Sequence, residues 1–222
     1  KIVFTSAGSP SRWTQFLKSK GIIVVHVVSS VKFALKAVSA GVDAIVCEGF
    51  EAGGHNGREE TTTFTLIPQV KEKLKIPLIA AGGIGSGRGM LAAMVLGADG
   101  VQIGSRFAAT EESSAHDNFK NKIVAVKDGD THLTLKELAP VRLIKNKFFD
   151  EVQKLYQKNP TQDQLKDLLG RARAKKGMFE GDLDNGELEI GQIAGIIHSI
   201  KPAKEVLENI IREFEQIKKT FK

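Results

Sequence analysis

The sequence predicts an α/β protein built on a parallel sheet, and two observations support this prediction. The first is a series of short runs rich in Val and Ile, which are typical of strands buried on both faces. These runs cover residues 1–4, 22–28, 43–48, 77–82 and 100–104. The second is a set of amphipathic helix patterns between the runs, over residues 11–19, 30–40, 66–74 and 87–97. Regular alternation of strands and helices is typical of a parallel sheet.

The spacing of these elements singles out one loop. Gly41, Pro77 and Gly97 mark helix ends, and the predicted strands begin at evenly spaced positions with one exception. The interval between the third and fourth strands is longer, and its extra length falls on residues 49–65. We expect a functional site there, because α/β proteins place active sites in loops after the carboxyl ends of their strands.

The second half of the chain has a different character. It is polar and rich in Lys, and its patterns predict helices over residues 113–127, 134–147, 148–158, 161–173 and 202–221. A glycine-rich interruption covers residues 175–195. We therefore predict a sheet domain over residues 1–110 and a helical extension or lid over residues 111–222, which ends in a helix packed on the sheet domain.

Composition narrows the classes of function. The 222 residues are 41% hydrophobic and 26% charged, which suits a soluble globular protein, and no apolar run is long enough to span a membrane. No signal peptide is recognisable. Cys47 is the single cysteine, so disulfides and cysteine metal sites within the chain are excluded. We expect a cytoplasmic protein with Cys47 as a buried structural thiol.

The net charge of +6 does not indicate a nucleic-acid partner. Basic residues are spread along the chain and mixed with acidic ones, and one Tyr and one Trp provide no ladder for stacking bases. We interpret the charge as solvated helix surface. We expect no nucleic acid and no membrane partner, and we leave a homodimer open.

His55 stands out in the long loop, within the stretch "EGFEAGGHNG". It is either a ligand-facing group or a loop histidine that satisfies nearby backbone. His26 lies within a predicted strand and is expected in the core or the barrel interior. The other three histidines are expected on the surface or on helices, and no pair has metal-ligand spacing, so we predict no metal site. They are His116, His132 and His198.

Two glycine-rich stretches follow neighbouring predicted strands: "AAGGIGSGRG" over 80–89 and "VQIGSRF" over 101–107. Glycines let backbone N–H groups approach an anion, and a helix N-terminus favours negative charge. The last two strands of a (β/α)8 barrel share a phosphate in this way, whereas a Rossmann fold has one fingerprint after its first strand. Tight βα turns are the alternative. We predict a phosphate near Gly82, Gly83, Gly104 and Ser105, with His55 at the same end of the barrel.

These long motifs closely resemble the FMN-dependent nitronate monooxygenase family, formerly called 2-nitropropane dioxygenases. The superfamily includes flavin enoyl-acyl-carrier-protein reductases, and "EGDLDNGELEIGQIAGIIHSIKPAKEV" over 180–206 is especially similar to their C-terminal region. The resemblance implies a TIM barrel, in which the five predicted strands correspond to strands four to eight. We therefore expect that about three N-terminal βα units lie outside this sequence, with the residues that they add to the pocket.

The resemblance also implies residue roles. His55 would be the catalytic histidine, and Gly53 and Gly54 would line the flavin. The FMN phosphate would be held by Ala81, Gly82, Gly83, Gly104 and Ser105. Ser29 and Glu48, at strand ends, are weaker cofactor-side candidates.

The implied reaction is oxidation of an alkyl nitronate with O2 to a carbonyl compound and nitrite. The alternative is an NAD(P)H-dependent FMN enoyl-acyl-carrier-protein reductase of fatty-acid synthesis, which acts on an enoyl thioester. A second alternative is a flavin- or phosphate-binding module without catalysis.

Overall fold

The computed structural model describes residues 1–6 and 8–220. The chain forms two compact units. Unit 1 comprises Lys1–Glu51, Glu59–Ile103 and Ile210–Lys222, and unit 2 comprises Ala52–Arg58 and Gly104–Asn209. The change from one to the other at Gly104 lies close to the expected boundary at residue 110. Two segments differ from the expected division, because the loop around His55 belongs to unit 2 and the C-terminal segment to unit 1.

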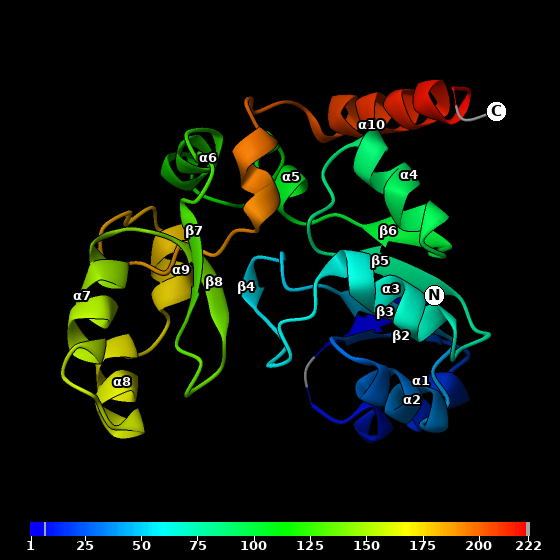
Figure 1. Ribbon diagram of the computed structural model, residues 1–222, viewed down its shortest axis with the longest axis horizontal. Helices are drawn as coiled ribbons and strands as arrows, with labels where there is room; N and C mark the ends of the chain where they lie inside the picture. Colours follow the sequence, from blue (N-terminus) through cyan, green and yellow to red (C-terminus); the bar gives the residue numbers. More distant parts are fainter. Residues whose placement is uncertain (7, 221–222) are drawn as a thin grey trace. The chain divides into compact units, whose positions relative to one another are not determined.

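Unit 1 is built on a five-stranded parallel sheet, as predicted (Figure 1). The strands lie in the order β1-β2-β3-β5-β6, and every neighbouring pair is parallel. Their bounds are Ile2–Thr5 (β1), Ile23–Val28 (β2), Ala44–Glu48 (β3), Leu78–Ala81 (β5) and Gly100–Gln102 (β6). The sequential order of the strands and the helices between them confirm the predicted barrel-type α/β fold class.

The predicted helices of this half are also present. They are η1 (Pro10–Arg12) with α1 (Thr14–Ser19), α2 (Val31–Ser39), α3 (Thr63–Lys71) and α4 (Gly87–Val95). Ser30 caps α2 by accepting from Phe33 N, and Ser86 caps α4 by accepting from Gly89 N. These local signals place the helices directly after the strands.

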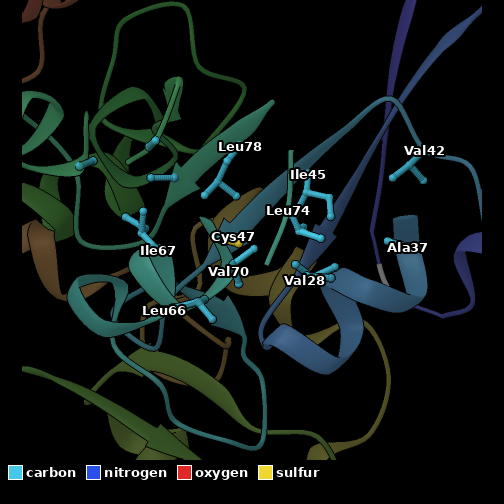
Figure 2. Packing of buried hydrophobic residues seen from close by; sticks show 14 of the residues in the cluster. Val28, Ala37, Val42, Ile45, Cys47, Leu66, Ile67, Val70, Leu74 and Leu78 are labelled. Atoms are coloured by element: carbon cyan, nitrogen blue, oxygen red, sulfur yellow. The ribbon is translucent and has the colours of Figure 1, made fainter. Parts of the chain in front are cut away.

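The main core of unit 1 lies on one face of the sheet, against the helices (Figure 2). Side chains alternate along β3, so Ile45 and Cys47 enter this cluster while Ala44 and Val46 enter a second cluster on the other face. Leu66, Ile67 and Val70 of α3 complete the main cluster.

The last helix, α10 (Ala203–Lys218), joins unit 1 through its second half. Glu213 Oε2 accepts a hydrogen bond of 2.8 Å from Gly87 N, at the start of α4. A Cβ at Gly87 would overlap the backbone of Ile210 and Phe214, so the absence of a side chain permits this close packing. The predicted end of this helix at residue 221 lies outside the described residues.

Unit 2 contains a three-stranded antiparallel sheet in the order β4-β8-β7. The strands are Gly54–His55 (β4), Thr131–Thr134 (β7) and Val141–Ile144 (β8). The helix predicted over residues 134–147 is therefore wrong. Pro140 lies in the middle of that range, where it would disrupt a helix, and all four residues of β8 are buried. Because β8 is buried between β4 and β7, its sequence lacks the alternation of apolar and polar residues expected of a strand on the surface.

The helices of unit 2 are short. They are α5 (Ser105–Ala108), α6 (Asp117–Val124), α7 (Lys147–Tyr156), α8 (Gln162–Leu169), α9 (Arg173–Met178) and the 3-10 helix η2 (Gln192–Ile196). Two apolar clusters support them, one around Phe119 and Leu188 and the other around Phe148 and Leu165. The predicted helices over 113–127, 148–158 and 161–173 correspond to α6, α7 and α8.

Candidate functional site

The glycine pair after β5 presents free backbone donors. Gly82 and Gly83 have φ angles of +89° and +69°, which favour glycine over other residues. Within residues 1–6 and 8–220, neither of their N–H groups donates a hydrogen bond. A half-buried pair of free donors fits an anion such as a phosphate.

The backbone at this glycine pair is bound by the side chain of Thr63, the first residue of α3. The buried Thr63 hydroxyl lies 2.9 Å from Gly82 O and 3.2 Å from Ala81 O. Glu51 Oε2 lies 2.9 Å from Thr63 N and 3.0 Å from Thr63 Oγ1, and therefore binds the first turn of α3. Neither residue was predicted from the sequence. The available signal was a Glu in the long loop that is followed by a Thr near the start of the next helix pattern.

The first turn of α4 contributes less to an anion site than the sequence suggested. Gly87 N donates to Glu213 and Gly89 N donates to Ser86 Oγ at 3.1 Å, so two of its donors are already used within unit 1. Gly82 and Gly83 contribute free donors at the end of β5, and at the start of the helix Arg88 N, between the two used donors, also has no acceptor within the described residues.

The two weaker candidates lie at the expected strand ends. Glu48 is the last residue of β3 and pairs in register with Ala81, and its partial burial raises the pKa of its carboxyl. Ser29 follows β2, and its hydroxyl donates to Glu59 Oε2 at 3.3 Å. Both side chains thus start from the same edge of the sheet as the glycine pair.

The second glycine stretch begins just after β6. Gln102 pairs with Ala81, so both glycine stretches leave the sheet at the carboxyl ends of neighbouring strands. A Cβ at Gly104 would meet nothing within 4 Å, and its φ of −98° is accessible to any residue. The fold itself therefore does not require glycine at position 104. Ser105 Oγ accepts a hydrogen bond of 3.0 Å from Gly191 N, which leaves its hydroxyl hydrogen for another acceptor.

His55 lies on β4, at the edge of the unit 2 sheet, and its side chain is exposed. It pairs with Val141 of β8, and the next residue, Asn56, donates its N–H to Pro140 O at 2.9 Å. The Asn56 side chain also donates to Ala52 O and Gly54 O at 3.0 Å. These bonds fix the backbone on both sides of His55, so its imidazole is presented from a rigid support.

The neighbouring glycines have a different physical role from the one expected. A Cβ at Gly53 would lie 2.5 Å from Gly191 N and 2.6 Å from Ile190 Cα. A Cβ at Gly54 would lie 2.7 Å from Glu189 Oε2. The missing side chains therefore allow residues 189–191 to approach the loop. That Gly53 and Gly54 also line a flavin stays a prediction, as does the approach of the glycine pair of unit 1 to His55.

Two acidic residues in unit 2 were not singled out in the sequence. Burial raises the pKa of the Glu187 carboxyl to about 7, an effect that Glu189 increases and Arg173 opposes. Burial also raises the pKa of Glu189, while the charge of His55 lowers it. The spacing of Glu187 and Glu189, two residues apart in a strand-like run, was the signal that could have identified them.

The cysteine and the other four histidines each have a packed, capping or exposed position. Cys47 is buried in the main core of unit 1, and desolvation raises the pKa of its thiol to about 12, as expected of a structural thiol. His26 is also buried, with Nδ1 2.7 Å from Thr5 Oγ1. His116 caps α6. His132, in β7, and His198 are exposed.

The described residues contain neither a metal site nor a membrane-spanning helix. Residues 1–6 and 8–220 contain no group of three His, Cys, Asp or Glu side chains that could hold a metal ion. The helices in this part of the chain are too short or too polar to cross a membrane.

Comparison with known proteins identifies the family to which this chain belongs. The sequence profile described as nitronate monooxygenase matches residues 1–213. A probable nitronate monooxygenase from Staphylococcus saprophyticus is 34% identical over an alignment of 214 positions, and the match covers 90% of this chain and 59% of that protein. One from Staphylococcus aureus strain JH9 is 35% identical with the same coverage. The chain thus spans 59% of the length of these relatives.

Solved structures give the same assignment. FabK from Thermotoga maritima is 40% identical with a TM-score of 0.93, over 99% of this chain and 70% of that one. Nitroalkane oxidase from Streptomyces ansochromogenes is 26% identical with a TM-score of 0.80, over the whole of this chain and 66% of that one. Because the family profile covers nearly all of the sequence and these relatives agree with it, the chain belongs to the nitronate monooxygenase family of flavin enzymes.

Proposed function

We propose that this chain acts in an FMN-dependent nitronate monooxygenase, which oxidises alkyl nitronates with O2 to carbonyl compounds and nitrite. The observation that supports FMN most directly is the pair of unused N–H donors at Gly82 and Gly83. Gly104 adds to it, because no atom of residues 1–6 and 8–220 lies within 4 Å of the position that its Cβ would occupy. In this proposal the two glycine stretches, with Ser105, hold the phosphate of FMN.

When bound, FMN supplies the electron transfer and the reaction with O2 that amino-acid side chains do not provide. The chain supplies binding, orientation and proton handling. A nitronate is already an anion, and His55 would donate a hydrogen bond to its oxygen atoms and hold them in place. If the neutral nitroalkane enters, the same imidazole would accept the proton from the carbon next to the nitro group. The exposed position of His55 on a fixed edge strand supports both roles.

A second candidate function has its own support. FabK from Thermotoga maritima is 40% identical over nearly the whole chain, a higher identity than that of the Staphylococcus proteins. The alternative is therefore NAD(P)H-dependent reduction of an enoyl thioester, for which bound FMN would supply the hydride chemistry and His55 would position or donate the proton that completes the reduction.

An anaerobic experiment separates these functions. The FMN-loaded protein is mixed with the nitronate of 2-nitropropane and, separately, with NADH or NADPH, while flavin absorbance is followed. We expect bleaching by the nitronate and slow or no bleaching by the nicotinamides. Fast bleaching by NADH or NADPH that crotonyl thioester reverses would overturn the monooxygenase in favour of the reductase. A protein that holds FMN but responds to neither reagent would be a binding module.

A further inference from the structure

The segment that carries Glu189 is fixed as firmly as the strand that carries His55. Ile144 N donates to Leu188 O at 2.9 Å, and an isolated bridge pairs Glu189 with Leu143. The residues on either side of Glu189, Leu188 and Ile190, are 0% and 3% exposed. Glu189 therefore projects from a short strand-like run held against β8, which is also the strand that pairs with His55.

The Glu189 carboxyl lies directly beside the loop that carries His55. Its Oε2 atom is 2.7 Å from the position that a Cβ of Gly54 would occupy, so a side chain at position 54 would displace the carboxylate from this place. Gly54 has a φ of +74° and immediately precedes His55. No hydrogen bond to the Glu189 side chain occurs within the described residues, whereas its charge and that of His55 interact.

An acid in this position favours a positive or hydrogen-donating partner. Its neighbour Glu187 is acidic too, and repulsion between the two carboxylates directs Glu189 toward a positive or hydrogen-donating group. Two side chains on the adjoining strands can donate: the buried Arg142 of β8, opposite Gly54, and the exposed His55 imidazole of β4, which remains free to turn toward the carboxylate. A carboxylate beside an imidazole selects which ring nitrogen holds the proton and fixes the ring orientation.

We propose that Glu189 is a positioning residue for His55, holding the imidazole in one orientation and one tautomer beside the Gly54 backbone. This inference rests on the proposed role of His55 and deepens it. Glu189 does not act on substrate itself. It restricts the rotation of an exposed histidine, so that the ring nitrogen facing the substrate is the same in every molecule.

The test uses the FMN-loaded full chain and the variants Glu189→Gln, Glu189→Asp, His55→Ala and the double variant Glu189→Gln with His55→Ala. Glu180→Gln is the matched control, because Glu180 is an exposed acid of unit 2 that binds Lys175. The probe substrate is the nitronate of 2-nitropropane or, if the protein is a reductase, crotonyl thioester. Ring-nitrogen signals of His55 in NMR spectra, assigned by their loss in His55→Ala, provide a readout that does not depend on turnover.

We expect Glu189→Gln to lower kcat roughly 10- to 100-fold, since general acid–base catalysis contributes 100-fold or more and depends on orientation. Glu189→Asp should retain more activity than Glu189→Gln. FMN affinity should not change, the His55 ring signals should shift, and Glu189→Gln should cause no further loss in the His55→Ala background. Glu180→Gln should resemble the unmodified chain in each respect.

Two results would overturn the inference while leaving the proposed function intact. One is a Glu189→Gln variant with full activity beside an inactive His55→Ala. The other is an equal loss from Glu189→Gln with and without His55, which would mean that Glu189 acts through the fold. Full activity in His55→Ala would instead contradict the catalytic role of His55, and the NMR signals would still decide whether Glu189 holds the ring.

Discussion

Glu51 and Thr63 form a clasp at the base of the glycine pair: Glu51 Oε2 accepts both the N–H and the hydroxyl of Thr63, at 2.9 and 3.0 Å. The Thr63 hydroxyl also lies within hydrogen-bond distance of the carbonyls of Ala81 and Gly82. One buried side chain thus ties the long loop, the start of α3 and the end of β5 together.

Replacing Thr63 with Val should loosen this clasp. Val keeps the shape but removes the hydroxyl, so Gly82 O loses this donor, at a cost of about 1–3 kcal/mol in the free energy of unfolding. FMN should bind more weakly, because Gly82 and Gly83 would lose their support. Urea unfolding and quenching of FMN fluorescence measure the two effects. Thr65→Val, an exposed substitution two residues along the same helix, should change neither.

Gly104→Ala should separate flavin binding from folding. The Cβ of an alanine there meets no atom of the described residues within 4 Å and the φ is accessible, so the free energy of unfolding of the apoprotein should stay within about 0.5 kcal/mol of its original value. FMN affinity should fall, because the added methyl group enters the space proposed for the phosphate. Gly100→Ala, which also meets no atom within 4 Å, is the control, and an equal loss of affinity in it would contradict the assignment.

Gly53→Ala should show the opposite pattern. Its methyl group would lie 2.5 Å from the backbone of residues 190–191, and relieving that overlap should cost about 1–3 kcal/mol in unfolding free energy. The lost stability should appear in apoprotein and FMN-loaded protein alike. Thermal melts of both forms provide the comparison, and an unchanged melting temperature would show that residues 189–191 do not pack on this loop.

Glu187 predicts a pH dependence of stability. Burial raises its pKa in the folded protein from an ordinary value of 4.5 to about 7, so the folded state binds this proton more tightly than the unfolded state does. The stabilising contribution is therefore fully present below pH 4.5 and is lost as the pH rises through 7. Glu187→Gln should remove that dependence and raise the free energy of unfolding at pH 8 by on the order of 1–3 kcal/mol.

Urea unfolding of both proteins at pH 5 and pH 8 measures the effect of Glu187. If the difference between the two pH values is the same with and without Glu187, another group is responsible. Glu189 and Arg173 face Glu187, so Glu189→Gln serves as a comparison for the coupled acid.

Cys47 should be inert in the folded protein. Its burial and a pKa of about 12 leave almost no thiolate at pH 8, so a thiol reagent such as DTNB should not label it without denaturant. In urea, labelling should reach one equivalent, because Cys47 is the single cysteine. Fast labelling of the native protein would show that the main core of unit 1 opens readily.

The sequence was most informative where local patterns and packing agree. All five strands of unit 1 were predicted because runs such as residues 43–48 are buried on both faces and flanked by helices with clear caps. The glycine pair was singled out because it follows a predicted strand, and His55 because it lies in an enlarged loop of a regular repeat; their roles stay predictions. Cys47 was correctly predicted as a buried thiol from its apolar neighbours.

The sequence was least informative where structure depends on distant residues. The strands β7 and β8 were mistaken for part of a helix, because their pattern follows from pairing with each other and with β4 rather than from local preference. The packing of Gly53 against Ile190 could not be predicted for the same reason. The spacing of Glu187 and Glu189 was a local signal for an acidic pair, but only the fold brings Glu189 beside Gly54.

The pairing of His55 with Val141 has a consequence for biosynthesis. The histidine is translated long before the strand that holds it, so on the ribosome its loop must wait for residues 131–144, and then for the run around Glu189, before it takes its final form. Strand pairing between such distant segments is a slow step in folding. A nascent chain released before that point would contain all five strands of the parallel sheet and the glycine pair, but would present His55 on an unsupported loop.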